Sequence, residues 1–177
     1  MKKIASVICV VAALALISNT ASAQYKQGDK LLNLGIGLNT YYTGGIPVSG
    51  IFEYGFTKQI SAGGGIDYLS YHYGAFGNNY GFTSVYVGAR GSYHFSELMN
   101  LNTDKVDIYG GLSLGYRTFT WNDSNIGYTG LDGNYGSGLF LGIHAGARYY
   151  FNNHFAGFGE LGALGSTNVR IGVTIKW

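Results

Sequence analysis

Apolar residues recur at every second position along most of the chain, in one segment after another. Segment 32–39 is typical, because Leu32 and Leu34 alternate with Asn33 and Gly35. A period of two is the period of a β-strand whose two faces meet different surroundings. There are eight such segments: 32–39, 46–57, 60–68, 84–95, 106–117, 138–151, 160–163 and 169–177.

Most connections between these segments alternate between short and long, with 43–45 and 164–166 as exceptions that are short where long loops are expected. Positions 58–59 and 152–153 read as tight turns, and a polar turn lies at 100–104, whereas 74–81 and 122–136 read as polar loops. Eight antiparallel strands return the chain to the side where it began. The pattern predicts an all-β fold, an eight-stranded antiparallel transmembrane β-barrel with short turns at one end and longer loops at the other.

The choice between a lipid-facing and a soluble barrel depends on which residues share a face. A soluble barrel would turn its apolar face inward and place the polar face in water, but charged residues make up only 11% of the chain, against about 25% in soluble domains. We therefore expect the apolar face to meet lipid and the polar face to line a narrow, filled lumen. The predicted lumen charge network consists of Glu53, Asp67, Arg90, Asp107, Arg117, Arg148, Glu160 and Arg170, with Lys176 at the end of the last strand.

Large aromatic residues sit near the ends of the apolar faces. Tyr, Phe and Trp side chains form belts at the two interfaces of a membrane barrel. One predicted belt contains Tyr54, Phe56, Tyr93, Phe95, Tyr149, Phe151 and Trp177, and the other contains Tyr42, Tyr68 and Tyr116. Other aromatic residues face inward and add bulk to the lumen: Tyr86, Tyr109, Phe140, Tyr150 and Phe158.

The first residues predict export. Lys2 and Lys3 precede an apolar run at 4–17, and Ala21 and Ala23 supply a small-residue cleavage site. A retained membrane anchor is the alternative, but the run is shorter than the ~20 residues that a spanning helix needs. We expect a signal peptide at 1–23 and a barrel domain at 24–177.

Cleavage would change the chemistry of the mature chain. Cys9, the single cysteine, lies in the signal, so no disulfide or thiolate site is expected after it. Without Lys2 and Lys3, 9 of the 11 basic residues remain against 9 acidic ones. A chain without a basic excess is a poor partner for nucleic acid.

The alternation and the chain end together resemble the small eight-stranded outer-membrane barrel family of Gram-negative bacteria, which includes porin-like "outer membrane protein beta-barrel" domains. The resemblance covers 32–177. The end resembles the assembly signal that the barrel-assembly machinery recognises, and its residues are Val169, Ile171, Val173, Ile175 and Trp177. The resemblance implies an outer-membrane location, with membrane lipid, lipopolysaccharide and the assembly machinery as partners.

Two motifs and one pair suggest chemistry that the strand pattern opposes. Segment 157–162 spells the dinucleotide fingerprint, which needs a following helix, and 111–115 spells a nucleophile elbow with Ser113, which needs a strand-to-helix turn. His144 was a possible partner for Ser113 on the neighbouring strand. His72 and Asp67 could form an acid–histidine pair at the outer rim.

Three functions stay open at this stage. The first is a non-catalytic barrel with a structural or loop-mediated role, the second is a narrow porin-like channel, and the third is an enzyme at the rim that modifies lipid or peptide. The sequence favours the first function, and we predict no catalytic residue and no cofactor. We also predict no metal site, because the histidines are too scattered for metal-ligand spacing.

Overall fold

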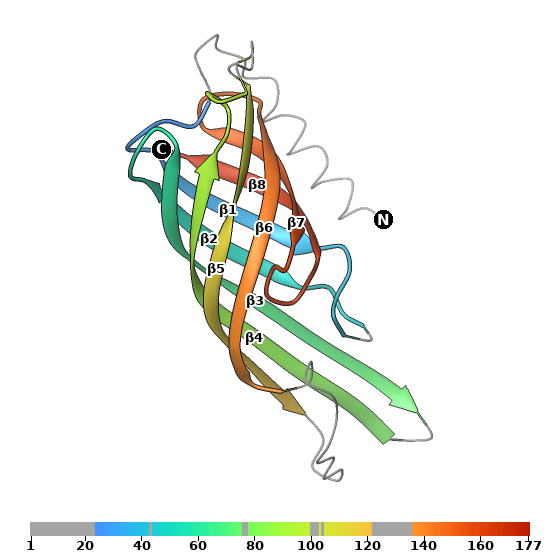
Figure 1. Cartoon of the computed structure of the whole chain (residues 1–177). Helices are drawn as coiled ribbons and strands as arrows, with labels where there is room; N and C mark the ends of the chain where they lie inside the picture. Colours follow the sequence, from blue (N-terminus) through green and yellow to red (C-terminus); the bar gives the residue numbers. More distant parts are fainter. Residues whose placement is uncertain (1–23, 43, 76–77, 100–102, 104, 122–135) are drawn as a thin grey trace, which may run out of the picture.

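Hydrogen bonds run from each strand to the next around a full circle, so that the sheet closes on itself (Figure 1). Every pair is antiparallel, including the closing pair between the first and last strands. This confirms the predicted fold class. The strands are β1 (Lys30–Gly37), β2 (Val48–Gly55), β3 (Ile60–Ala75), β4 (Asn78–His94), β5 (Val106–Trp121), β6 (Gly138–Tyr150), β7 (Phe155–Gly162) and β8 (Val169–Lys176).

The computed structural model describes residues 24–42, 44–75, 78–99, 103, 105–121 and 136–177. The predicted signal peptide at 1–23 lies outside the described residues, as do most of the loop predicted at 122–136 and most of the turn at 100–104. Cleavage after Ala23 therefore stays a prediction. Within the described part of the chain, no helix is long and apolar enough to cross a bilayer.

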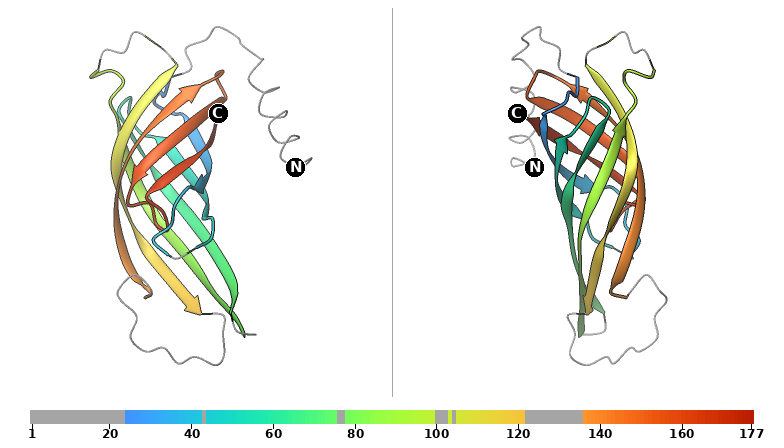
Figure 2. Two further views of the ribbon diagram at one scale, coloured as in Figure 1. Left: turned by 90° about the vertical axis from the view of Figure 1, so that its right-hand side faces the viewer. Right: turned by 60° about the vertical axis from the view of Figure 1, so that its left-hand side comes forward.

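The two ends of the barrel differ. One end, here called the terminal end, holds Gln24–Asp29 and Trp177, and Lys30 N donates to Trp177 O over 2.9 Å. The other, here called the loop end, carries the β3–β4 and β5–β6 connections. Strands β3 to β6 project past the shorter strands at the loop end (Figures 1 and 2).

One predicted loop is a strand pairing instead. Segment 74–81 was expected to be a polar loop, but the β3–β4 ladder continues through Tyr73 and Tyr80 to Ala75 and Asn78. A run of polar residues argues against a strand only within the membrane, where one face of each strand must be apolar. A hairpin that extends past the lipid can be polar and still keep its ladder hydrogen bonds.

The predicted faces are found as expected along the strands. Outward apolar side chains are exposed, as for Leu34 (43%), Leu112 (60%) and Leu141 (72%). The largest fully buried side chains instead include Arg148, Glu53 and many other polar residues of the lumen. The protein is thus apolar outside and polar inside, which is the distribution that a lipid-embedded barrel requires.

Glycine allows the strands to approach closely inside the barrel. A Cβ atom on Gly63 would lie 1.9 Å from Phe52 O, and one on Gly111 would lie 1.9 Å from Gly91 O. No side chain fits at such a distance from a neighbouring backbone carbonyl. The inward glycines therefore leave the lumen to the long polar side chains.

Candidate functional site

The Glu53 carboxylate is the centre of the polar cluster in the lumen. It accepts hydrogen bonds from Asn33 Nδ2 (2.9 Å), Ser61 Oγ (3.0 Å) and Ser92 Oγ (2.8 Å). Arg148 Nη2 adds an ion pair at 2.8 Å. A buried carboxylate needs this number of donors, because burial removes the water that would otherwise solvate its charge.

Arg148 connects two carboxylates while fully buried. Its Nη2 pairs with Glu53, and its Nη1 lies 3.0 Å from Asp107 Oδ2. The guanidinium carbon also lies 3.9 Å from the centre of the Tyr109 ring, which is a cation–π contact. These contacts join β2, β5 and β6 across the lumen.

Glu160 forms a second centre towards the loop end. It pairs with Arg90 at 2.8 Å and with Arg170 at 3.1 Å, and it accepts a hydrogen bond from Tyr109 Oη at 3.0 Å. Arg170 in turn pairs with Asp67 at 2.7 Å. The three arginines Arg90, Arg148 and Arg170 therefore share the four carboxylates of the lumen.

A serine, a histidine and an aspartate lie in line at the terminal end. Ser61 Oγ is 3.0 Å from His94 Nε2, and His94 Nδ1 is 2.9 Å from Asp107 Oδ1. These distances match a Ser–His–Asp triad. The sequence analysis did not find this group, because only the strand register brings position 61 next to 92 and position 94 opposite 109.

The segment before β1 covers that group. The Tyr25 ring stacks on the His94 imidazole, with 3.5 Å between centroids and 4° between planes. Its hydroxyl donates to the carbonyl oxygens of Thr57 or Ile60, each 2.8 Å away. Burial raises the pKa of the Tyr25 phenol well above its usual value, with the negative charge of Asp107 adding to the rise.

Lys176 closes the same end. Its ammonium lies 3.3 Å from Asp29 Oδ2 and donates to Gln24 O at 3.0 Å. The last strand is thereby fastened to the segment that precedes the first strand.

The catalytic motifs of the sequence do not assemble. Ser113 lies opposite Gly142 within the strands, and His144 Nε2 is instead 3.0 Å from Ser92 Oγ. His72 is exposed at the loop end, whereas Asp67 is buried and paired with Arg170. The fingerprint at 157–162 is part of β7, with no helix after it in the described chain.

Aromatic side chains fill the lumen at the loop end. Tyr42, Leu69 and Phe82 are buried together. Phe119 stacks on Phe82 at 5.2 Å between centroids, and Trp121 meets Phe82 edge-on at 6.1 Å. We call these five residues the aromatic cap.

Tyr42 was placed wrongly by the sequence analysis. It was expected in the second outer belt with Tyr68 and Tyr116, which are 47% and 50% exposed. Tyr42 is only 6% exposed, and its hydroxyl lies 3.1 Å from Ser84 Oγ inside the barrel. It follows the end of β1, where the alternation of the strand no longer fixes the direction of a side chain.

Arg117 was expected in the charge network but lies apart from it. Its guanidinium carbon is 5.9 Å from the centre of the Tyr42 ring and 5.6 Å from that of Phe140. No carboxylate of the described residues forms an ion pair with it. It is 9% exposed, and its Nε has no hydrogen-bond partner in the described structure.

Comparisons with known proteins agree with this architecture. No protein-family model and no curated protein matches the chain. Among solved structures, the outer membrane protein OprG from Pseudomonas aeruginosa is 14% identical, with a TM-score of 0.57 over 88% of this chain and 98% of that one. The N-terminal β-barrel domain of Pseudomonas aeruginosa OprF is 19% identical, with a TM-score of 0.54 over 86% and 100%. A de novo designed transmembrane β-barrel is 17% identical, with a TM-score of 0.51 over 87% and 99%.

The chain has the fold of the small eight-stranded outer-membrane barrels. Its apolar outer surface and polar interior suit the bacterial outer membrane, in agreement with the predicted location. At these identities the solved structures support the architecture, and they assign no activity to it.

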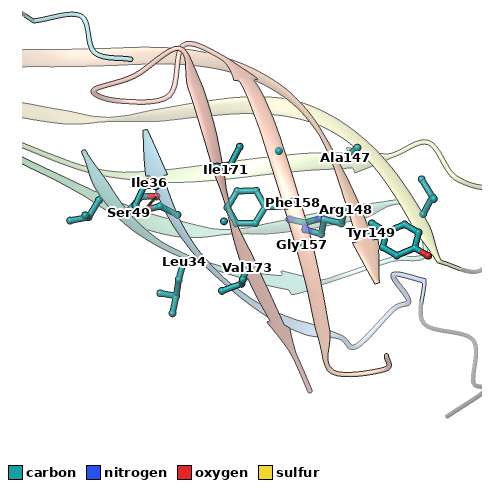
Figure 3. Close-up of a pocket in the computed structure, with 15 residues that line it drawn as sticks. Leu34, Ile36, Ser49, Ala147, Arg148, Tyr149, Gly157, Phe158, Ile171 and Val173 are labelled. Atoms are coloured by element: carbon teal, nitrogen blue, oxygen red, sulfur yellow. Dashed lines mark hydrogen bonds between the residues drawn. The ribbon is translucent and has the colours of Figure 1, made fainter. Parts of the chain in front are cut away.

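A broad apolar groove of about 1110 Å³ lies along the wall of this membrane barrel (Figure 3). Leu34, Ile36, Ile171 and Val173 line it, and β7 contributes Gly157 and Gly159, which have no side chains. Most of its lining is apolar, but Arg148 of the polar cluster and the inward Phe158 also line it (Figure 3). Membrane lipid would cover it in the folded protein.

The residues of the predicted assembly signal lie on the same outer surface. Ile171, Val173 and Trp177 are 42%, 38% and 53% exposed. Val169 and Ile175 lie on the same face of β8 as Ile171 and Val173.

No group of three or more metal-ligating side chains occurs in the part of the chain that the structure describes.

Proposed function

We propose that this protein is a non-catalytic outer-membrane barrel with a plugged lumen, which has a structural role in the envelope or presents its loops to partners. The observation that carries the proposal is the series of ion pairs across the lumen. Arg148 joins β6 to Glu53 on β2, Arg90 joins β4 to Glu160 on β7, and Arg170 joins β8 to Asp67 on β3.

The space left between these side chains supports a plugged lumen. A void beside Arg90, Arg170 and His144 has a volume of about 20 Å³, which is room for about one water molecule. Tyr25 covers the terminal end of the cluster, and the aromatic cap packs inside the loop end and narrows it. A solute would have to displace buried ion pairs to pass.

Two features argue against hydrolysis by the Ser61–His94–Asp107 group. Ser61 is fully buried, and Tyr25 stacks on the histidine that would accept its proton. Ser61 Oγ also lies 3.0 Å from the Glu53 carboxylate, whose negative charge would oppose an oxyanion formed there. We assign this group to packing of the lumen.

The outer surface suggests the remaining partners. Its apolar belt would contact outer-membrane lipid and lipopolysaccharide, and the β8 residues Ile171, Val173 and Trp177 would face the assembly machinery during insertion. Both partners are part of the proposal.

Conductance of the purified protein in a planar lipid bilayer tests the plugged lumen. We expect no large, stable single-channel steps at neutral pH. Such steps would overturn the proposal and favour the narrow porin-like channel. In parallel, a fluorophosphonate probe should not label the wild-type protein, and labelling that Ser61→Ala abolishes would identify an enzyme.

A further inference from the structure

Arg117 differs from the other lumen arginines in having no anionic partner. Arg90, Arg148 and Arg170 each pair with carboxylates over 3.1 Å or less. Arg117 is about nine-tenths buried, yet no described carboxylate pairs with it. Burial of a charge without a partner costs several kcal/mol in real proteins, on the order of the stability of a whole domain.

The carboxylates of the network have other partners within contact distance. They pair with Arg90, Arg148 and Arg170, and Asp107 Oδ1 also lies 2.9 Å from His94 Nδ1. The contacts of Arg117 with Tyr42 and Phe140 use the faces of aromatic rings. A ring face attracts a cation but accepts no strong in-plane N–H hydrogen bond, and Arg117 Nε has no hydrogen-bond partner in the described structure.

Other groups at the loop end lie near this charge. Burial raises the pKa of the Tyr41 phenol, while the positive charges of Arg117 and Arg170 oppose that rise. Tyr41 N donates to Ser166 O at 3.3 Å, and the fully buried Ser166 Oγ has no hydrogen-bond partner in the described structure. Arg117 Nε and Ser166 Oγ are therefore both buried at the loop end without a hydrogen-bond partner in the described structure.

We propose that Arg117 is the centre of a binding site for a small soluble oxyanion, either inorganic phosphate or a carboxylate. A guanidinium presents paired N–H donors that match two oxygens of such an anion. The aromatic side chains near Arg117 exclude water, and this strengthens the interaction between its guanidinium and a bound anion. The anion comes from solution and not from lipid, because Arg117 faces the lumen while Tyr116 and Thr118 face outward.

The experiment uses the full barrel domain, folded in uncharged detergent micelles. Thermal unfolding is followed while sodium phosphate replaces sodium chloride at constant ionic strength, and a second series uses sodium acetate. A bound anion stabilises the folded state by mass action, so at ten times its Kd the wild-type midpoint should rise by about 3 °C. Calorimetric titration with phosphate then gives the affinity directly.

Three variants separate the site from general salt effects. Arg117→Gln should weaken phosphate binding by at least about tenfold, since a charge-assisted hydrogen bond is lost. Arg117→Lys keeps the charge without the paired donors and should bind with intermediate affinity. Lys58→Gln removes an exposed cation at the terminal end and should bind phosphate as the wild type does.

Two results would overturn the proposal. The first is the same phosphate response in Arg117→Gln and the wild type, or no binding by the wild type. The second is binding that appears only after Asp123 and Asp132 are changed to Asn, because a carboxylate of the chain itself would then be the natural occupant. Calorimetry with Arg117→Lys keeps the test decisive if Arg117→Gln does not fold.

Discussion

The two halves of the lumen contain the same kinds of residue but combine them differently. Towards the terminal end, carboxylates and guanidinium groups alternate. The Glu53 carboxylate by itself accepts four hydrogen bonds, from Asn33, Ser61, Ser92 and Arg148. Towards the loop end, Arg117 lies beside the rings of Tyr42 and Phe140, and no carboxylate of the described residues pairs with it. We therefore expect an inward arginine to stabilise the barrel only where the facing strands supply its carboxylate partners.

The largest effect should come from removing the central arginine of the terminal half. Arg148→Met leaves the buried carboxylates of Glu53 and Asp107 without their shared cation, and should cost about 3 to 5 kcal/mol. Arg117→Met is the matched control and should not destabilise the barrel, because it removes an unpaired buried charge and leaves no carboxylate uncompensated. Unfolding in urea from detergent micelles measures both, and equal losses would show that the two halves do not differ.

A double-mutant cycle should locate coupling within the network. Asp67→Asn and Arg170→Met each break the 2.7 Å pair, and the double variant should be more stable than the sum of the single losses predicts. We expect a coupling of about 1 to 3 kcal/mol from the unfolding free energies. If the two losses are additive, the interaction between Asp67 and Arg170 contributes no free energy of its own, and each loss reflects only the surroundings of the residue that was changed.

A smaller loss should follow Tyr25→Ala at the terminal end. The change removes the stacking on His94 and one hydroxyl hydrogen bond, together about 1 to 2 kcal/mol. It should also speed modification of His94 by diethyl pyrocarbonate, which mass spectrometry detects. Gln27→Ala changes the same segment without removing the stack and should leave the rate of His94 modification unchanged. If both variants raise that rate, the whole segment, and not the Tyr25 ring, protects His94.

The smallest effect on stability, but a clear one on assembly, is expected for loss of Trp177. Its side chain is 53% exposed on the outer surface, so Trp177→Ala, which keeps the backbone hydrogen bonds with Lys30, should change the unfolding free energy by under about 0.5 kcal/mol. The amount inserted in cells should fall, because the β8 end would no longer match the assembly signal. Unchanged insertion, measured by outer-membrane fractionation, would make the resemblance at Trp177 coincidental.

Local alternation predicted which way most side chains face, and from that the interior position of every lumen charge. It could not predict the pairs, because Arg148 and Glu53 are 95 positions apart and meet only when the register of every intervening strand is set. For the same reason the Ser61–His94–Asp107 alignment was missed. Alternation was misleading in two places. At 74–81 the strand pairing continues although the residues no longer alternate between apolar and polar, and before Tyr42 the strand ends, so that the side chain of Tyr42 faces inward.

The ion pairs across the lumen also have a mechanical consequence. The wall of this barrel is a single sheet with many glycines, which carry no side chains to stiffen it. Arg148–Glu53 ties β6 to β2, on opposite sides of the circle, and Arg90–Glu160 and Arg170–Asp67 tie further pairs of facing strands. These contacts act as cross-braces, so the cross-section should keep its shape as membrane thickness and composition change, even where the wall itself is soft.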